Sequence, residues 1–591
     1  MKERSRVLLL ENIRGERLGR LIDQNCMKCA LHMLADLGLE SSSVYEEDFE
    51  TYFLEGTQAF YRNESRLFLS QNSCPDYLKR VERRISEEMA RVPNYLHSST
   101  KPKLQLIMET ELISTHAQAL IESKTSGLGL LLEQSKDRMD DLKRMYELFF
   151  RVPSAMRLLQ DALYEHVRAA GTSLLDDDIK VKQPVEFLRS LLALKNKYDA
   201  VVCCAFQGEK IAQKRLKDAF ESFINLDTRC ASCLVIYIDE LMRSGFKGTT
   251  EGEMESELDK ILAIFRYLHD KDIFGMLYKQ HLAKRLLNHR SMSSEAERLM
   301  LAKLKGECGY QYTTKLEGMF SDIKFSRGTT EKYNACRKRA PHEYSPSFKI
   351  ACNIDVTMLT AGYWPLQCMS PCFLPDAAKA ATELFEEFYL GEHSGRKLTW
   401  VTNCGSVELR ATLSEDLRHE LCVSTYQMCI LVLFNTHHPD AGLPFEEIAR
   451  ATQIPKSELK RHLISICTPK HRILLKSTKG KGIAESSTFR VNVGFSTKLK
   501  RVRVPLVAMK EIGARSDWHH DQQPDRVKED RRHLCEATIV RVMKARKVIT
   551  HNELIAEVRV HLQNTNEILQ TGHTSASSSF FPPAPVHQKI D

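Results

Sequence analysis

The residues best placed to take part in chemistry lie in the segment 537–547, near the carboxyl end of the chain. Its apolar residues recur at the spacing of one helix face: Ala537, Val540 and Met543. Its basic residues recur at the same spacing on a second face: Arg541, Lys544 and Lys547. A lysine projecting between two cations from such a helix is a candidate acceptor for an acyl group delivered by another enzyme. The same spacing is typical of a solvated basic face, so spacing alone leaves both interpretations open.

Size and composition favour an intracellular globular protein of several domains. The chain has 591 residues, 42% of them hydrophobic and 27% charged, and its net charge of +8 is too small for a nucleic-acid-type polycation. The longest apolar stretch, near Met428–Phe434, is far shorter than the ~20 residues of a spanning helix. The apolar run at 7–10 is too short for a secretory signal. We therefore expect no membrane partner and a cytoplasmic and nuclear location.

The 17 cysteines lie mostly beside other apolar residues, which favours reduced thiols over a disulfide framework. Two pairs have C-x-x-C spacing: Cys26/Cys29 and Cys230/Cys233. Neither pair has histidines nearby at zinc-finger spacing, and His519-His520-Asp521 is interpreted as a solvated linker. The sequence contains no G-x-x-x-x-G-K-[ST] phosphate loop, no H-E-x-x-H and no persuasive Cys/His nucleophile pair. We therefore expect no metal, no cofactor and no catalytic residue.

Helical periodicity dominates the first half of the sequence. Pro75 opens one predicted helix that Pro93 closes, and Ser154 caps another that ends at Gly171. Similar segments continue to about Arg243, and the short loops between them favour antiparallel neighbours in an elongated bundle.

Strand-like alternation appears only after residue 353. The stretch 356–359 is predicted to be a short strand and 377–390 a helix. Apolar residues then alternate with polar ones in two stretches: Leu398 and Trp400, followed by Val407, Leu409 and Ala411. The turn at 403–405 between these stretches predicts a hairpin.

A winged helix is predicted next, with a helix–turn–helix at 445–466 and wing strands at 473–476 and 487–491. After a linker that includes 498–503, residues 530–562 begin a second unit of the same kind. A Ser/Pro-rich tail follows it.

Several motifs resemble signatures of the cullin family, in the order in which that family carries them. They are the segments 43–50, 271–287, 315–322, 360–365 and 393–396. The first is closest to the form used by the cullin-3 branch, and the resemblance extends from about Arg20 to Leu562. The segment 537–547 resembles the acceptor helix of the family, whose lysine receives the ubiquitin-like protein Nedd8 through an isopeptide bond. The resemblance therefore assigns Lys544 as the Nedd8 acceptor.

The resemblance implies a non-catalytic scaffold of a cullin–RING ubiquitin ligase, activated by neddylation. In that family the α/β module embeds a strand of a RING-box protein, and the RING recruits a ubiquitin-charged E2 enzyme. The residues expected to contact the RING-box protein are Tyr363, Trp364, Leu398, Thr399, Trp400, Val407, Glu408 and Leu409. Strand addition suits them, although the two stretches can equally pair with each other.

The implied fold is mainly α, with a helical-repeat stalk, a helical bundle, a small α/β module and winged helices. The expected domains are a stalk of second and third repeats (1–245), a four-helix bundle (246–353), an α/β module (354–415), winged helix A (416–505), a linker (506–529), a partial winged helix B (530–562) and a disordered tail (563–591). The first stalk repeat, which docks the BTB-type adaptor in the cullin-3 branch, has no counterpart, which makes docking of a BTB-type adaptor by the familiar surface doubtful.

Winged helix B has no third helix or wing in the sequence, so 530–562 is expected to be loosely held with its apolar side chains exposed. These are Leu554, Ile555, Val558 and Leu562. Two alternatives remain at this point. One is a degenerate cullin that binds partners without supporting ligation. The other is a DNA-binding protein that uses basic residues of its helix–turn–helix: Lys456, Lys460, Arg461, Lys470 and Arg472.

Overall fold

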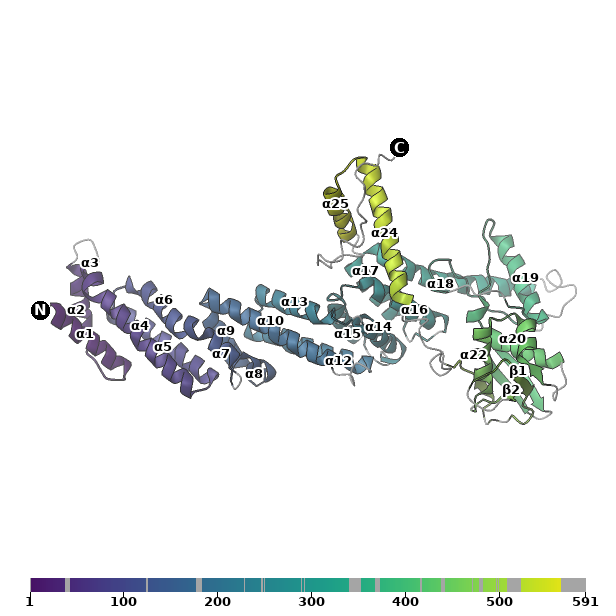
Figure 1. Cartoon of the computed structure of the whole chain (residues 1–591), viewed down its shortest axis with the longest axis horizontal. Coiled ribbons are helices and arrows are strands. Elements are labelled where there is room, and N and C mark those ends of the chain that lie inside the picture. The colour runs from purple at the N-terminus through teal and green to yellow at the C-terminus, as the bar shows by residue number, and fades with distance from the viewer. Residues whose placement is uncertain are drawn as a thin grey trace. The chain divides into compact units, whose positions relative to one another are not determined.

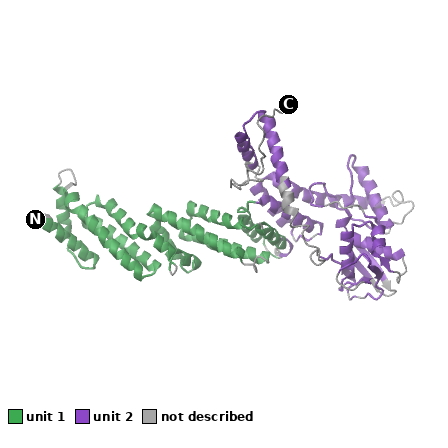
Figure 2. Cartoon of the chain, viewed as in Figure 1, with its two compact units in different colours: residues 1–241, 248–269 green, residues 242–247, 270–591 purple. Residues whose placement is uncertain are grey.

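Two compact units make up the chain, one formed by residues 1–241 and 248–269 and the other by 242–247 and 270–591 (Figure 2). The computed structural model describes residues 2–37, 43–123, 126–135, 137–176, 183–227, 229–245, 248, 250–288, 290–291, 293–339, 352–366, 372–414, 417–436, 442–469, 471–477, 482–495, 497, 499–507 and 522–564.

The first unit is built from helices, with no strand among its described residues (Figure 1). Its helices are α1 (Lys2–Arg17), α2 (Gln24–Asp36), α3 (Ser43–Tyr45), α4 (Thr51–Gln71), α5 (Cys74–Tyr95), α6 (Thr100–Leu112), α7 (Ala117–Glu122), α8 (Leu128–Glu133), α9 (Met139–Phe150), α10 (Pro153–Asp176), α12 (Pro184–Ala200), α13 (Lys210–Ile224), α14 (Arg229–Glu240) and α15 (Glu251–Phe265). Short 3-10 and π-helical turns join several of them.

Two predicted helix ends prove to be early. Helix α5 continues two residues beyond Pro93, because this proline lies in the last turn and Leu96 closes the helix with an N–H bond to the Arg91 carbonyl (3.3 Å). Helix α10 passes through Gly171 and ends at Asp176. A Cβ at Gly171 would lie 2.4 Å from the Phe223 ring of α13, so this glycine permits close helix packing instead of ending a helix.

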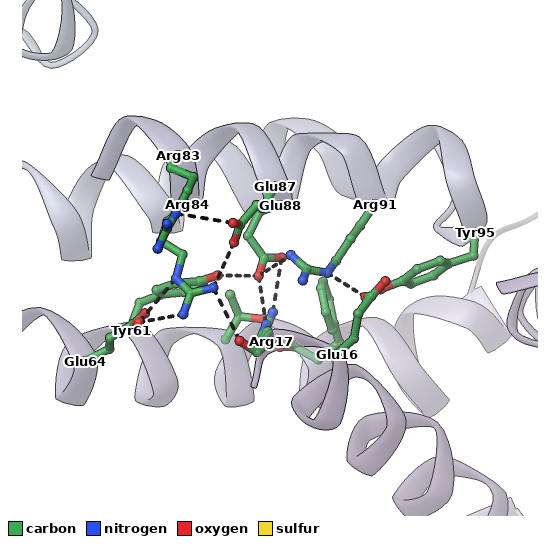
Figure 3. A network of polar contacts seen from close by, with 12 residues as sticks. Glu16, Arg17, Tyr61, Glu64, Arg83, Arg84, Glu87, Glu88, Arg91 and Tyr95 are labelled. Atoms are coloured by element: carbon green, nitrogen blue, oxygen red, sulfur yellow. Dashed lines mark hydrogen bonds and ion pairs between the residues drawn. The ribbon is translucent and has the colours of Figure 1, made fainter. Parts of the chain in front are cut away.

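A buried polar network joins α1, α4 and α5 (Figure 3). The fully buried Glu88 carboxylate of α5 accepts hydrogen bonds from Arg17 Nε of α1 (2.8 Å) and from the Tyr61 hydroxyl of α4. Arg17 also donates to Thr57 Oγ1 (2.7 Å), and Arg91 Nη1 lies 3.0 Å from the Glu88 carboxylate. Because a buried charge without its partner is strongly unfavourable, the network ties α1 to the α4–α5 pair.

The second unit begins with three helices: α16 (Lys271–Leu287), α17 (Ser294–Cys308) and α18 (Tyr310–Arg339). Arg285 of α16 and Glu297 of α17 are fully buried and form an ion pair of 2.7 Å. A Cβ at Gly275 would meet the Tyr312 side chain at 2.6 Å, so the glycine lets α16 and α18 approach closely.

A three-stranded sheet follows α19 (Asp376–Glu392), which confirms the helix predicted at 377–390. Strand β1 (Ser406–Ser414) pairs antiparallel with β2 (Leu417–Ser424), and β6 (Arg501–Arg503) pairs parallel with β2.

Three sequence predictions are wrong at this sheet. The predicted hairpin is absent, because β1 pairs with β2 and Thr402–Cys404 forms a 3-10 turn. Period-two alternation shows that a stretch is extended but does not choose its partner. The boundary predicted between 415 and 416 falls inside the β1–β2 hairpin. The stretch 498–503, interpreted as linker, contains β6.

The predicted helix–turn–helix and wing are confirmed. They comprise α20 (Thr425–Leu433), α21 (Phe445–Thr452), α22 (Lys456–Cys467) and a sheet of β3 (Leu443–Pro444), β5 (Thr488–Val491) and β4 (Leu474–Lys476) in that order. Ser424 begins α20 through a capping box with Gln427. Residues of α20–α22 share one buried core with Leu421 and Val423 of β2, so the two sheets belong to one packed body.

The chain's last described elements are α24 (Gln522–Arg546) and α25 (His551–Asn564), which lie side by side in Figure 1. Residues 522–529, predicted as linker, belong to α24. The expected exposure of Val558 and Leu562 is wrong: both are buried with Val542, because the two helices pack against each other. The predicted tail beyond 564 lies outside the described residues.

Taken together, the described residues confirm the predicted mainly α fold. Among them no helix is long and apolar enough to span a membrane.

Candidate functional site: an aromatic layer and an exposed lysine

An aromatic layer lies between α18 and α19 of the second unit. It is built from Tyr333 of α18 and from Phe385, Phe388 and Tyr389 of α19. The Tyr333 ring meets those of Phe385 and Phe388 at centroid distances of 5.1 and 5.3 Å. Burial raises the pKa of the Tyr333 phenol, which stays neutral.

Two extended segments, 352–360 and 397–401, pack their alternate side chains on this layer. Residues packed against it are Ile354, Val356, Met358, Leu398 and Trp400. Trp400 contacts Phe385 edge-on, with ring centroids 6.1 Å apart. Among the described residues neither segment belongs to a β-ladder, so the strand predicted at 356–359 is extended but unpaired.

One face of α18 binds the backbone of segment 352–360. Ser326 Oγ accepts from the Met358 N–H (2.7 Å) and lies 3.1 Å from the Met358 carbonyl oxygen. Thr330 Oγ1 donates to the Val356 carbonyl (3.2 Å). Asp322 accepts from the N–H and the hydroxyl of Thr360, both at 2.8 Å.

The turn after this segment is held by the same helix. Trp364 is buried, and its indole N–H donates to Asp322 at 2.8 Å. The Tyr363 ring covers Gly318, where a Cβ would lie 2.5 Å from it, and Gly362 takes the left-handed φ of +87° that the turn requires. Tyr363 and Trp364, predicted as partner contacts, therefore position the segment in the free chain.

The predicted contact residues are divided between two places. Tyr363, Trp364, Leu398, Thr399 and Trp400 lie at or beside the aromatic layer, with only Thr399 fully exposed. Val407 and Leu409 belong to β1 and pack on the winged-helix core, while the exposed Glu408 pairs with Arg501 of β6. The structure thus separates the second group from the aromatic layer.

Lys544 is exposed in the last turn of α24. Among the described residues its amine has no recorded hydrogen-bond or ion-pair partner. The helix ends at Arg546, and Lys547 lies outside it with a left-handed φ of 61°. The predicted basic stripe is therefore interrupted after Lys544. The negative pole of the helix end favours cations at this point.

The apolar face predicted for this helix is wrong. Ala537 and Val540 are exposed, Val540 by 50%. The residues that pack towards α25 are Leu534, Cys535, Ile539 and Val542. The sequence contains both apolar stripes, and only the packing of α25 selects one of them.

Two groups of contacts escaped the sequence prediction. Asp322, Ser326 and Thr330 recur every four residues on α18. An ordinary solvent-exposed helix face has the same polar spacing, so the sequence does not distinguish the two. In the first half of α24, Arg531 donates to Asp270 Oδ1 (2.7 Å), at the N-cap of α16, and to Asp272 Oδ1 (2.6 Å), in its first turn. The hydrogen bond to Asp272 raises the pKa of Arg531, which remains charged.

Three basic residues of the helix–turn–helix, Lys456, Lys460 and Arg461, are engaged in contacts within the chain. Glu485 of the wing lies 3.6 Å from Lys456 and 3.4 Å from Lys460, and the hydrogen bond from Lys460 lowers the pKa of Glu485. Arg461 donates to the Val507 carbonyl (3.2 Å). Lys470 lies outside the described residues. This pairing reduces the positive charge that a DNA groove would need.

The two C-x-x-C pairs lie in different environments. Cys230 and Cys233 are buried in α14, and burial raises the pKa of Cys233 to about 11, which keeps the thiol protonated. Cys26 and Cys29 are exposed on α2. In the described parts of the chain, no three His, Cys, Asp or Glu side chains are grouped to hold a metal ion.

Comparison with known proteins gives matches along the chain. Residues 1–330 match the cullin alpha solenoid domain, 358–495 the cullin alpha+beta domain and 530–571 the cullin protein neddylation domain. Cullin-3A of Arabidopsis thaliana is 41% identical over 557 residues, which cover 94% of this chain and 73% of the relative. Cullin-3 of Dictyostelium discoideum is 40% identical (95% and 76%), and human Cullin-4A is 37% identical (93% and 69%).

Proposed function

Because this chain belongs to the cullin family, we propose that it holds a RING-box protein at the aromatic layer and is switched on by Nedd8 at Lys544. The chain is a scaffold subunit of a cullin–RING E3 ubiquitin ligase. We place it in the cytoplasm and nucleus and assign covalent chemistry to its partners.

The RING-box protein is proposed to add a strand to the extended segment 352–360. Two observations support this. The segment exposes alternate side chains to an aromatic layer, as a strand does, yet it is in no ladder among the described residues. An added strand gains backbone hydrogen bonds along its length and side-chain contacts at every second residue. The RING then recruits an E2 enzyme charged with ubiquitin.

The scaffold accelerates transfer through effective concentration. When a substrate and a charged E2 enzyme are held on one chain, attack of a substrate lysine on the thioester becomes effectively intramolecular. The proposed scaffold needs no reactive group of its own for this step.

Lys544 is proposed as the substrate of a separate transfer. Its neutral Nζ attacks the thioester carbonyl of a Nedd8-charged E2 enzyme, an isopeptide C–N bond forms, and the C–S bond breaks to release the E2 thiol. The exposure of Lys544, inside a segment that matches a neddylation domain, is the observation that carries this assignment.

A neddylation reaction on the full chain tests the assignment. Lys544→Arg should abolish the single modification, whereas Lys547→Arg, the matched change three residues away, should be modified like the wild type. Equal modification of the Lys544→Arg and wild-type chains would remove Lys544 from the proposal.

A further inference from the structure

We propose that Asp322, Ser326 and Thr330, here called the α18 stripe, select the edge of segment 352–360 that receives the partner strand. The stripe occupies one edge of the segment and leaves the other open. This inference rests on the proposed function, because it identifies the backbone groups to which the RING-box strand is added.

Strand geometry determines which backbone groups of the segment lie on each edge. In an extended chain the N–H and C=O groups of one residue point to the same side, and those of the next residue point to the opposite side. The α18 stripe bonds Val356, Met358 and Thr360. The backbone groups of Asp355, Thr357 and Leu359 therefore point away from α18. In the described structure these three residues have no recorded backbone hydrogen bond.

Burial makes the stripe effective as a positioning device. Ser326 is 5% exposed, so the Met358 N–H that it binds is shielded from water and needs this hydroxyl. A strand cannot be added on that side without displacing α18. The stripe thereby fixes which residues of the segment present their N–H and C=O groups to a partner.

The open edge also defines the partner's chemistry. Ile354, Val356 and Met358 pack on the aromatic layer, whereas Asp355 and Thr357 face solvent. A matching strand places an apolar residue over the layer at every second position. On its solvent face, a basic or β-branched residue beside Asp355 and Thr357 makes the favourable cross-strand pair.

A binding measurement with purified RING-box protein tests the role of the stripe. The double variant Ser326→Ala/Thr330→Val should bind about ten-fold more weakly than wild type, as expected for two lost hydrogen bonds. The matched control is Ser321→Ala/Thr329→Val, because these hydroxyls bond only within α18, to Glu317 and Phe325. It should bind like wild type.

Equal affinity of both double variants would overturn the inference while leaving the proposed function intact. Failure of the wild-type chain to bind would instead overturn the proposed function.

Amide-resolved hydrogen exchange of the wild-type chain tests the edge without any substitution. In the free chain the Met358 and Thr360 amides should be protected, and those of Asp355, Thr357 and Leu359 should exchange freely. Adding the RING-box protein should protect the second set. Protection of all five amides in the free chain, or no new protection at 355, 357 and 359 in the complex, would contradict the assigned edge.

Discussion

Glu88 is the residue through which the first unit joins three helices. Its carboxylate is fully buried between Arg17 and Arg91, and it accepts a hydrogen bond from the Tyr61 hydroxyl (Figure 3). Removing the negative charge leaves the buried Arg17 guanidinium without its carboxylate partner, whereas Arg91 keeps its ion pair with Glu16. The identity of this one side chain therefore governs how firmly α1 is held on α4 and α5.

Glu88→Gln should lower the free energy of opening of α5 by about 3 kcal/mol, because it removes the charge but keeps the shape. Hydrogen-exchange protection of α5 amides measures this. Glu87→Gln is the matched control, since Glu87 is 37% exposed and its loss should change the value by less than about 0.5 kcal/mol. Equal effects of the two variants would show that the buried network does not stabilise the packing of α1 on α4 and α5.

The same network predicts a dependence on pH. Burial would raise the pKa of Glu16 and of Glu64, but hydrogen bonds from Tyr95 and Arg91, and from Arg84 and Arg80, outweigh it and lower both. A carboxyl with a lowered folded-state pKa stabilises the fold above its unfolded value, about 4.5, and loses this stabilisation as pH falls through the folded-state value.

We expect the Tm of the chain to fall steeply below about pH 4.5, and Glu64→Gln to reduce that slope. Thermal denaturation over a pH series measures both. An unchanged slope in the Glu64→Gln chain would show that this carboxyl does not contribute.

At the scale of elements, α24 and α25 pack on each other through a small apolar core. Among the described residues, its buried apolar side chains are Val542, Val558 and Leu562. Packing against α25 fixes the face of α24 that turns inward, and Lys544 lies on a different face, exposed to a modifying enzyme. The presentation of Lys544 therefore depends on a few apolar side chains.

Val558→Ala should weaken the α24–α25 pairing by about 1–3 kcal/mol and slow modification of Lys544. Val560→Ala, on the same helix but 53% exposed, should leave both unchanged. Hydrogen exchange of α25 and the rate of Nedd8 transfer are measured on the same samples. Modification of the Val558→Ala chain at the wild-type rate would show that the modification of Lys544 does not depend on the packing of α24 against α25.

The elements also show what sequence can and cannot predict here. Periodicity located α19 and the helix–turn–helix within a few residues, because each buries one face against a local core. It did not predict the pairing of β1 with β2, since alternation is the same for any partner. It also missed the α18 stripe, because polar residues every four positions on a helix are recognised as ligands only once the bound backbone is seen.

At the scale of the whole molecule, the proposed activities lie in one of the two units. The aromatic layer, the α18 stripe and Lys544 all belong to residues 270–591. The buried network of Glu88 belongs to the other unit. Changes at distant sites with no common partner are expected to act independently.

Glu88→Gln should therefore leave both RING-box binding and Lys544 modification at wild-type levels while it loosens α5. Both assays on one preparation measure this. A parallel loss of RING-box binding would show coupling between the units that the account does not contain.

The central claim is that this chain is a scaffold that holds a RING-box protein. The most direct test mixes this chain with a purified RING-box protein, separates the mixture by size-exclusion chromatography and measures the mass of the eluted species by light scattering. The account predicts a stable one-to-one complex that the Ser326→Ala/Thr330→Val chain forms less well. Separate elution of the wild-type chain and the RING-box protein would contradict it.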